Sequence, residues 1–160
     1  MNKINLYYEV AHSQLQEQDR RNGEFGGKAV GIMGVSASLL GINALVLRLS
    51  APGAQGLSAI EIGVGVALLL SFLATFTLCL SVVRTRSWLR SPRLKDFAHH
   101  LRDYEDEALT EWIGDQYRRS VEHNEGILSR KADLLSWGLG LLASSTLLTA
   151  LLAALLHGLA

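Results

Sequence analysis

The sequence has few cysteine, proline and aromatic residues, and its formal net charge is zero. Cys79 is the single cysteine, so no disulfide can form within the chain. The 15 basic and 15 acidic residues cancel, whereas a general nucleic-acid binder carries a basic excess. We therefore expect no nucleic acid among the partners. No proline interrupts residues 115–156, so this stretch is expected to form one continuous helix.

Motifs of catalysis are also missing. The sequence has no glycine-rich phosphate loop, no HExxH metal motif and no GxSxG nucleophile elbow. His99 and His100 are adjacent, but neighbouring residues of a helix point about 100° apart and no cysteine lies nearby to complete a metal site. We predict that the protein is not an enzyme and holds no metal or resident cofactor.

What the sequence does contain is three long uncharged apolar runs, at 29–47, 62–83 and 134–156. A helix of about 20 residues crosses the hydrocarbon core of a bilayer. Three such runs in 160 residues leave too little polar chain to cover them in water. The expected fold is a single-domain, all-α integral membrane protein, with three transmembrane helices and a cytoplasmic helical bundle. The expected segments are a cytoplasmic helix at 1–28, spans at 29–48, 62–83 and 134–156, and cytoplasmic helices at 84–133.

Basic residues are concentrated at one end of each predicted span. Ten of the 15 lie between Arg84 and Lys131, and Arg20 and Lys28 precede the first span, whereas the loop at 50–57 has no charge. Positively charged loops stay in the cytoplasm. The sequence therefore predicts a cytoplasmic N-terminus, a cytoplasmic 84–133 segment and a C-terminus outside.

Turn and capping residues predict where helices begin and end. The turn sequence SAPG at 50–53 favours a tight hairpin between the first two spans. Ser58 with Glu61 matches a capping box at the start of the second span. Ser91 followed by Pro92 predicts the start of a further helix.

Glycines predict two weak points in the helices. Gly23, Gly26 and Gly27 are expected to loosen the junction between the N-terminal helix and the first span. Gly114 is expected to bend or break the helix that begins near Pro92, with Asp115 capping its continuation.

Small residues recur every three or four positions in the spans. This spacing lets transmembrane helices approach closely. The contacts made by these residues lie either within one subunit or between subunits of a homo-oligomer, and the pattern is compatible with both. The predicted helix-packing residues are Gly31, Gly34, Ser38, Gly63, Ala67, Ser71, Thr75, Ser136 and Gly140.

A polar stripe precedes the third span. Gln116, Ser120, Asn124, Ile127 and Lys131 share one face of the expected helix. The simplest interpretation is a solvated helix face. The alternative is a site for a small anionic ligand, because buried polar groups need partners and arginine suits phosphate. The candidate ligand-binding residues are Gln116, Arg119, Ser120, Asn124, Arg130 and Lys131.

Three segments together resemble a known family. They are GGKAVGIMGVSASLLGI at 26–42, SPRLKDF at 91–97 and QYRRSVEHNEGILSRKADLLSWG at 116–138. Between about Gly26 and Leu152 the chain is similar to the transmembrane effector of Pycsar, the bacterial pyrimidine cyclase system for antiphage resistance. The resemblance implies an effector that resides in the bacterial inner membrane. It also implies activation by a cyclic pyrimidine nucleotide, cyclic CMP or cyclic UMP, which a neighbouring cyclase makes during infection.

On this interpretation the activated effector impairs the membrane, and the infected cell dies or stops growing. A different class remains open: a structural or accessory membrane subunit that docks a protein partner through its cytoplasmic helices. A phage holin fits less well, because the predicted cytoplasmic part is large and the predicted C-terminus lies outside.

Overall fold

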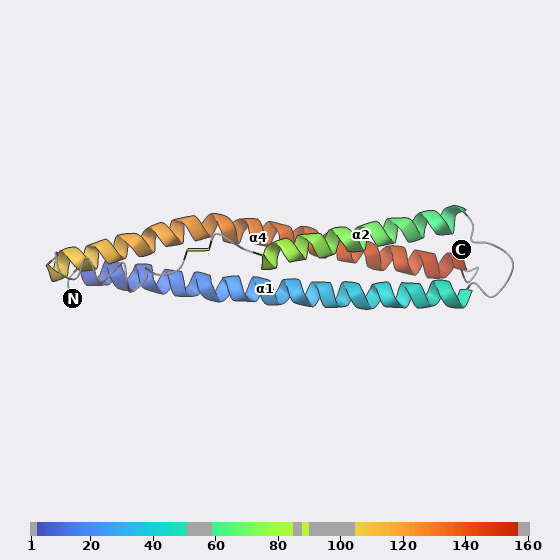
Figure 1. Cartoon of the computed structure of the whole chain (residues 1–160), viewed down its shortest axis with the longest axis horizontal. Helices are drawn as coiled ribbons and strands as arrows, with labels where there is room; N and C mark the ends of the chain where they lie inside the picture. The colour runs from blue at the N-terminus through green and yellow to red at the C-terminus, as the bar shows by residue number, and fades with distance from the viewer. Residues whose placement is uncertain (1–2, 51–58, 85–87, 90–104, 157–160) are drawn as a thin grey trace. The chain divides into compact units, whose positions relative to one another are not determined.

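The computed structural model describes residues 3–50, 59–84, 88–89 and 105–156, and in these residues the protein is all-helical (Figure 1). The helices are α1 (Lys3–Ser50), α2 (Ala59–Val83) and α4 (Asp106–Leu156). Each is long and apolar enough to cross a membrane. The prediction of three helices able to span a membrane is confirmed. The hairpin at 50–53, Ser58, His99 and His100, and the helix start at Ser91 lie outside the described residues.

Helix α1 is longer than the sequence led us to expect. The chain stays helical through Gly23, Gly26 and Gly27, so the expected loosening of this junction is not observed. A glycine inside a helix costs only about 1 kcal/mol relative to alanine, whereas proline, which α1 lacks, costs about 3 kcal/mol. Ion pairs on α1 between Arg20 and both Glu17 and Glu24 support the turns before and across Gly23.

Helix α4 likewise runs without interruption through Gly114, so the break expected there is wrong. Gly114 is buried, and a Cβ atom added to it would lie 2.6 Å from Cε1 of Tyr7. The glycine therefore allows the Tyr7 ring to approach the backbone of α4. Ala108 and Trp112 also belong to α4, which begins at Asp106 with two acidic residues in its first turn.

The chain folds as two compact units. The first, here called the polar unit, comprises Met1–Glu24 and Thr85–Lys131, and the second, the membrane unit, comprises Phe25–Arg84 and Ala132–Ala160. The membrane unit contains the three uncharged runs, and the polar unit contains the stripe that precedes the third run. Both units draw residues from α1 and α4.

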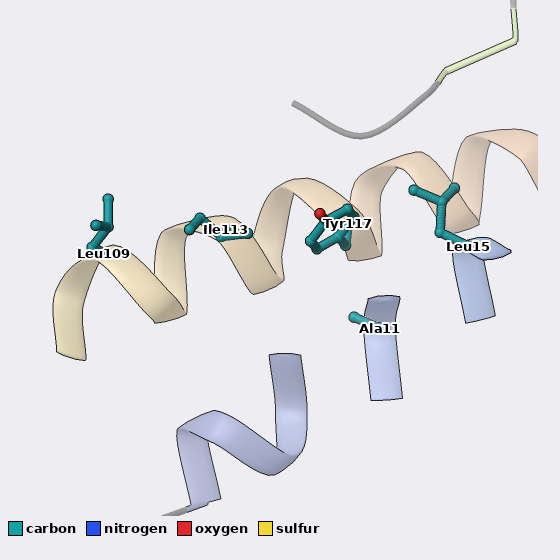
Figure 2. Close-up of a cluster of buried hydrophobic side chains, with 5 residues drawn as sticks. All are labelled: Ala11, Leu15, Leu109, Ile113 and Tyr117. Carbon is teal, nitrogen blue, oxygen red and sulfur yellow. The ribbon is translucent and has the colours of Figure 1, made fainter. Parts of the chain in front are cut away.

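Apolar side chains at helical spacing hold the polar unit together. Figure 2 shows Ala11 and Leu15 on α1 and Leu109, Ile113 and Tyr117 on α4, which form one buried cluster. On α4 these residues recur every four positions and so form a single stripe. Their burial explains why two largely polar segments associate.

Two apolar clusters hold the membrane unit together. One contains Ala29, Ile32, Cys79, Val82 and Leu135, and therefore joins all three helices. The other contains Leu68, Phe72 and Leu152.

Contacts between the helices give their directions in the membrane unit. Asn43 of α1 contacts Thr149 of α4, and Ala29 and Leu135 share a cluster, so α1 and α4 run in the same direction there. Ser71 contacts Ser145, whereas Cys79 lies near Gly138, so α2 runs the opposite way.

Candidate functional site

The polar stripe of α4 is largely buried in the polar unit. Asn124 is completely buried, and Ser120 and Lys131 are nearly so. Gln116 is half-buried, and its main-chain oxygen accepts a hydrogen bond from the Ser120 hydroxyl at 3.0 Å. Arg119 and Arg130 are exposed instead. The six candidate ligand-binding residues thus divide into an inward-facing group and two outward-facing guanidinium groups.

Asn124 binds main chain that is distant in sequence. Its Nδ2 donates to the Leu89 carbonyl oxygen at 2.7 Å, and its Oδ1 accepts from the Leu89 N–H at 3.0 Å. The neighbouring Trp88 donates its Nε1–H to Asp19 on α1 at 2.6 Å. The two-residue segment 88–89 is therefore held by side chains from both α1 and α4. The sequence did not indicate this role for Asn124, because its partner is a main-chain group 35 positions away.

Lys131 also has a partner inside the polar unit. Its Nζ donates to Oδ1 of Asn22 on α1 at 2.6 Å. Burial lowers the pKa of the Lys131 ammonium from its usual 10.5, because a charged group loses hydration there. Gln18 lies about one turn before Asn22 on α1, and its Nε2 donates to the Val121 carbonyl oxygen of α4 at 3.0 Å. Polar contacts thus follow the α1–α4 interface of the polar unit over several turns.

A groove of about 440 Å³ lies beside these contacts in the polar unit. Its lining residues are Ser13, Gln14, Glu17, Gln18, Arg21, Val121 and Glu125. Glu17 and Glu125 bring negative charge to it, and Arg21 brings positive charge. No pattern in the sequence predicted this groove, although the EQDRR run at 17–21 places acidic and basic residues one turn apart.

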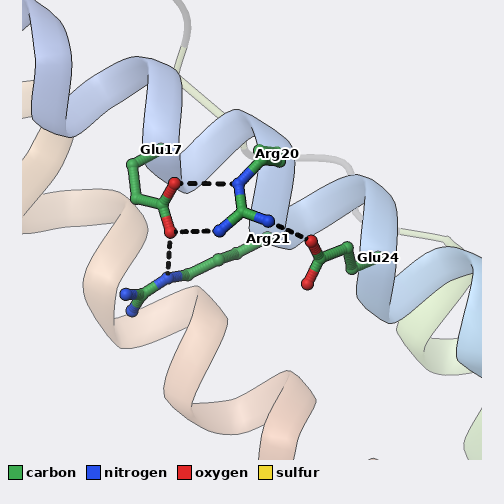
Figure 3. A network of polar contacts seen from close by, with 4 residues as sticks. All are labelled: Glu17, Arg20, Arg21 and Glu24. Atoms are coloured by element: carbon green, nitrogen blue, oxygen red, sulfur yellow. Dashed lines mark hydrogen bonds and ion pairs between the residues drawn. The ribbon is translucent and has the colours of Figure 1, made fainter.

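An ion-pair network borders the groove on α1 (Figure 3). Arg20 binds Glu17 through two hydrogen bonds, of 2.7 and 2.9 Å, and also pairs with Glu24. Arg21 donates to the same Glu17 carboxylate at 2.9 Å. The bonds from Arg20 and then from Arg21 lower the pKa of Glu17 from 4.5 to about 2. Glu17 therefore keeps its charge in acidic solution as well as at neutral pH, and Arg20 and Arg21 are both paired with carboxylates.

The small residues of the membrane unit divide into two groups. Thr75 is completely buried, and the Ser71 hydroxyl lies 2.7 Å from that of Ser145 in the same chain. These two residues of α2 therefore pack inside the unit. The remaining predicted packing residues are exposed: Gly31, Gly34, Ser38, Gly63, Ala67, Ser136 and Gly140. A Cβ added at any of these four glycines would meet no heavy atom within 4 Å.

A metal centre finds no support in the part of the chain that the structure describes. No three histidine, cysteine, aspartate or glutamate side chains come together there in a way that would hold an ion. Cys79 is buried and is a free thiol.

Comparison with protein families gives a match that covers residues of both units. The model of the Pycsar effector protein domain matches residues 11–158. No curated protein and no solved structure matches significantly. The matched range contains the buried stripe of the polar unit and all three apolar runs. Three helices able to span a membrane fit a multi-pass membrane protein of this family, whose role implies an effector rather than an enzyme. The chain belongs to the Pycsar effector family and has the role of a Pycsar antiphage effector.

Proposed function

We propose that this effector resides in the bacterial inner membrane, is activated there by cyclic CMP or cyclic UMP from a neighbouring cyclase, and impairs that membrane so that infection aborts. The family match across residues 11–158 carries this proposal, because it covers the polar and the membrane parts together. The polar unit is the proposed sensor, since its described residues hold the charged and hydrogen-bonding side chains that a nucleotide requires.

The proposed orientation places the N-terminus and residues 84–133 in the cytoplasm and the C-terminus in the periplasm. Its support is the charge asymmetry of the sequence. The helix directions in the membrane unit are compatible with it, because α1 and α4 run the same way and α2 runs oppositely. A cyclic nucleotide made in the cytoplasm would then reach the polar unit directly.

Two kinds of residue in the polar unit would serve the ligand differently. Because Arg119 and Arg130 are exposed, their guanidinium groups can donate charge-assisted hydrogen bonds to a phosphate. The buried Gln116, Ser120, Asn124 and Lys131 would position the helices around it, and Asn124 would do so through Leu89. A ligand shifts the helix packing only to the extent that it binds the active arrangement more tightly than the resting one.

Calorimetry on the full chain in detergent, with cyclic CMP and cyclic UMP, tests this proposal. Loss of one donor to a charged group costs about 1.5–3 kcal/mol, so Arg119→Ala or Arg130→Ala should weaken binding by roughly 10- to 150-fold. Asn124→Ala should instead lower stability and toxicity more than affinity, because its side chain contacts Leu89. Arg84→Ala, at the exposed end of the membrane unit, is the matched control.

The result also separates the two classes of function. If neither nucleotide binds the unsubstituted protein, the sensing role is wrong, and docking of a protein partner becomes the better explanation of the polar unit.

A further inference from the structure

The membrane unit has an inside-out distribution of side chains. Large apolar residues point outward: Leu70 is 61 % exposed, Trp137 70 % and Leu147 74 %. Polar side chains from all three helices are turned inward. We call these residues the polar seam: Ser36, Asn43, Ser71, Thr75, Ser145 and Thr149.

Short hydrogen bonds connect most of the seam. Asn43 Nδ2 donates to the Thr149 hydroxyl at 3.0 Å, and that hydroxyl donates to the Ser145 carbonyl oxygen at 2.8 Å. The Ser145 and Ser71 hydroxyls lie 2.7 Å apart, and the Thr75 hydroxyl donates to the Ser71 carbonyl oxygen at 2.9 Å. Counted along the helix axes, this path extends over roughly 12 Å of a hydrocarbon core about 30 Å thick.

One buried atom of the seam has no hydrogen-bond partner in the part of the chain that the structure describes. Asn43 is only 5 % exposed, and its buried Oδ1 accepts no hydrogen bond from the described residues. Lipid offers no donor, so a polar atom left unpaired in a membrane-spanning unit is strongly unfavourable. Helix packing alone would be served better by a fully satisfied or apolar side chain. A buried acceptor of this kind is one that a bound water molecule can satisfy.

Apolar clusters flank the seam. The cluster of Cys79, Val82 and Leu135 lies beyond Thr75, toward the C-terminal end of α2. The cluster of Leu68, Phe72 and Leu152 packs beside the other half of the seam, where Phe72 follows Ser71 directly and Leu152 lies three residues beyond Thr149 on α4. Apolar constrictions exclude water and so keep a polar path closed. One apolar cluster thus lies beyond the Thr75 end of the seam, and the other packs against the seam and reaches past its Thr149 end.

We propose that the polar seam lines a path for water and small ions, which opens when the effector is activated and the two apolar clusters separate. This rests on the proposed function, because it specifies how the membrane would be impaired: by a path along named residues rather than by general disruption of the bilayer.

The native cysteine is a probe of this path. Cys79 is the single cysteine, is completely buried and lies one turn beyond Thr75. In liposomes, a charged methanethiosulfonate reagent should label the unsubstituted protein only when cyclic CMP or cyclic UMP is present, and labelling should change the rate of ion leak. A Leu147→Cys variant in a Cys79→Ala background should stay unlabelled in both states, because position 147 faces outward.

Removal of single hydroxyls gives a second test. Thr75→Val and Ser145→Ala should abolish most of the nucleotide-dependent leak while leaving nucleotide affinity and thermal stability close to those of the parent protein. Thr77→Val is the matched control, because Thr77 makes the same kind of bond as Thr75, to the Leu73 carbonyl oxygen of its own helix at 2.8 Å, but its side chain is exposed. Its leak should be unchanged.

The outcomes distinguish failure of the proposed path from failure of the proposed function. If liposomes with the unsubstituted protein leak when nucleotide is added, but Cys79 stays unlabelled and Thr75→Val leaks normally, the proposed path along the polar seam is wrong. The membrane is then impaired in another way. If the unsubstituted protein binds nucleotide without causing a leak, or binds no nucleotide at all, both the proposed function and the proposed path along the polar seam are wrong.

Discussion

At the scale of single residues, the spacing of a side chain does not reveal what it contacts. Asn124 was a candidate for nucleotide contact because it lies on a polar stripe, and the structure places both of its hydrogen-bonding atoms on the Leu89 main chain. Gly114 was expected to interrupt a helix and instead accommodates an aromatic ring. In both cases the residue type was informative, but its partner was far away in the sequence.

Gly114→Ala should destabilise the protein. The added methyl group would lie 2.6 Å from the Tyr7 ring, so the ring must shift and its 3.0 Å hydrogen bond to Asp115 is disturbed. Overpacking of this kind costs about 1–3 kcal/mol. Gly126→Ala is the control: nothing lies within 4 Å of the added atom, and an exposed helical glycine gains roughly 1 kcal/mol on replacement by alanine. Thermal unfolding in detergent should show opposite shifts, and equal shifts would contradict the packing role of Gly114.

Lys131 should make stability depend on pH in the alkaline range. Its folded-state pKa is lowered below the unfolded value of 10.5 by burial, so the unfolded chain binds the proton more tightly. The cost of burying the charge is therefore fully present below the lowered pKa and is relieved as the pH rises toward 10.5. The stability of the parent relative to Lys131→Met should increase over that interval. A pH-independent difference, measured by denaturant unfolding, would show that burial does not affect the titration of Lys131.

At the scale of helices, residues that look alike in sequence have different environments. The small residues of α2 include Ser71 and Thr75, which face inward, and Gly63 and Ala67, which are exposed. On α1 and α4, Gly31, Gly34 and Gly140 are likewise exposed, with open space around each. Exposed glycines in a membrane-spanning unit are suited to close contact with a helix of another subunit.

Gly140→Leu should therefore weaken self-association without unfolding the subunit. The leucine has room in the monomer, because nothing lies within 4 Å of its Cβ, but it would hold a neighbouring helix away. The expected loss is about 1–2 kcal/mol, roughly 5- to 30-fold in association. Cross-linking and mass photometry in detergent would measure it.

Two other substitutions complete that experiment. Ala74→Leu, at an exposed position outside the predicted packing set, should leave the oligomer intact. Ser71→Leu should instead destabilise the subunit itself, because it would collide with Ser145 of the same chain. If Gly140→Leu has no effect on the oligomer, the exposed glycines of α4 face lipid.

At the scale of the whole molecule, the chain combines a polar unit and a membrane unit that share α1 and α4. The family match covers residues of both. The proposed function, sensing of a soluble nucleotide and action on a bilayer, requires both environments in one chain, and α1 and α4 contribute residues to both units.

The orientation of the whole chain is testable with reporter fusions. Fusions at residues 1 and 110 should report the cytoplasm and a fusion at residue 160 the periplasm, because the basic residues lie beside the first two sites. Phosphatase and fluorescent-protein reporters, which are active on opposite sides of the inner membrane, give the readout. A periplasmic signal at residue 110 would contradict the proposed access of a cytoplasmic nucleotide to the polar unit.

The sequence by itself determined the class of the protein. Uncharged runs at 29–47, 62–83 and 134–156 specify helices able to cross a membrane, because about 20 consecutive apolar residues match the thickness of a bilayer and cannot be covered in water by so short a chain. The continuity of α4 after residue 115 also follows from the sequence, since no proline interrupts it. These properties depend on local composition, which the sequence states directly.

Only the tertiary structure decided which faces meet. The pairing of Asn124 with Leu89, of Ser71 with Ser145 and of Gly114 with Tyr7 joins residues on different segments. A polar or small residue at helical spacing fits solvent, a ligand, another subunit or a neighbouring helix equally well, because its periodicity identifies a face and not the surface opposite. Packing selects among these possibilities through the complementary shapes and hydrogen bonds of groups far apart in the chain.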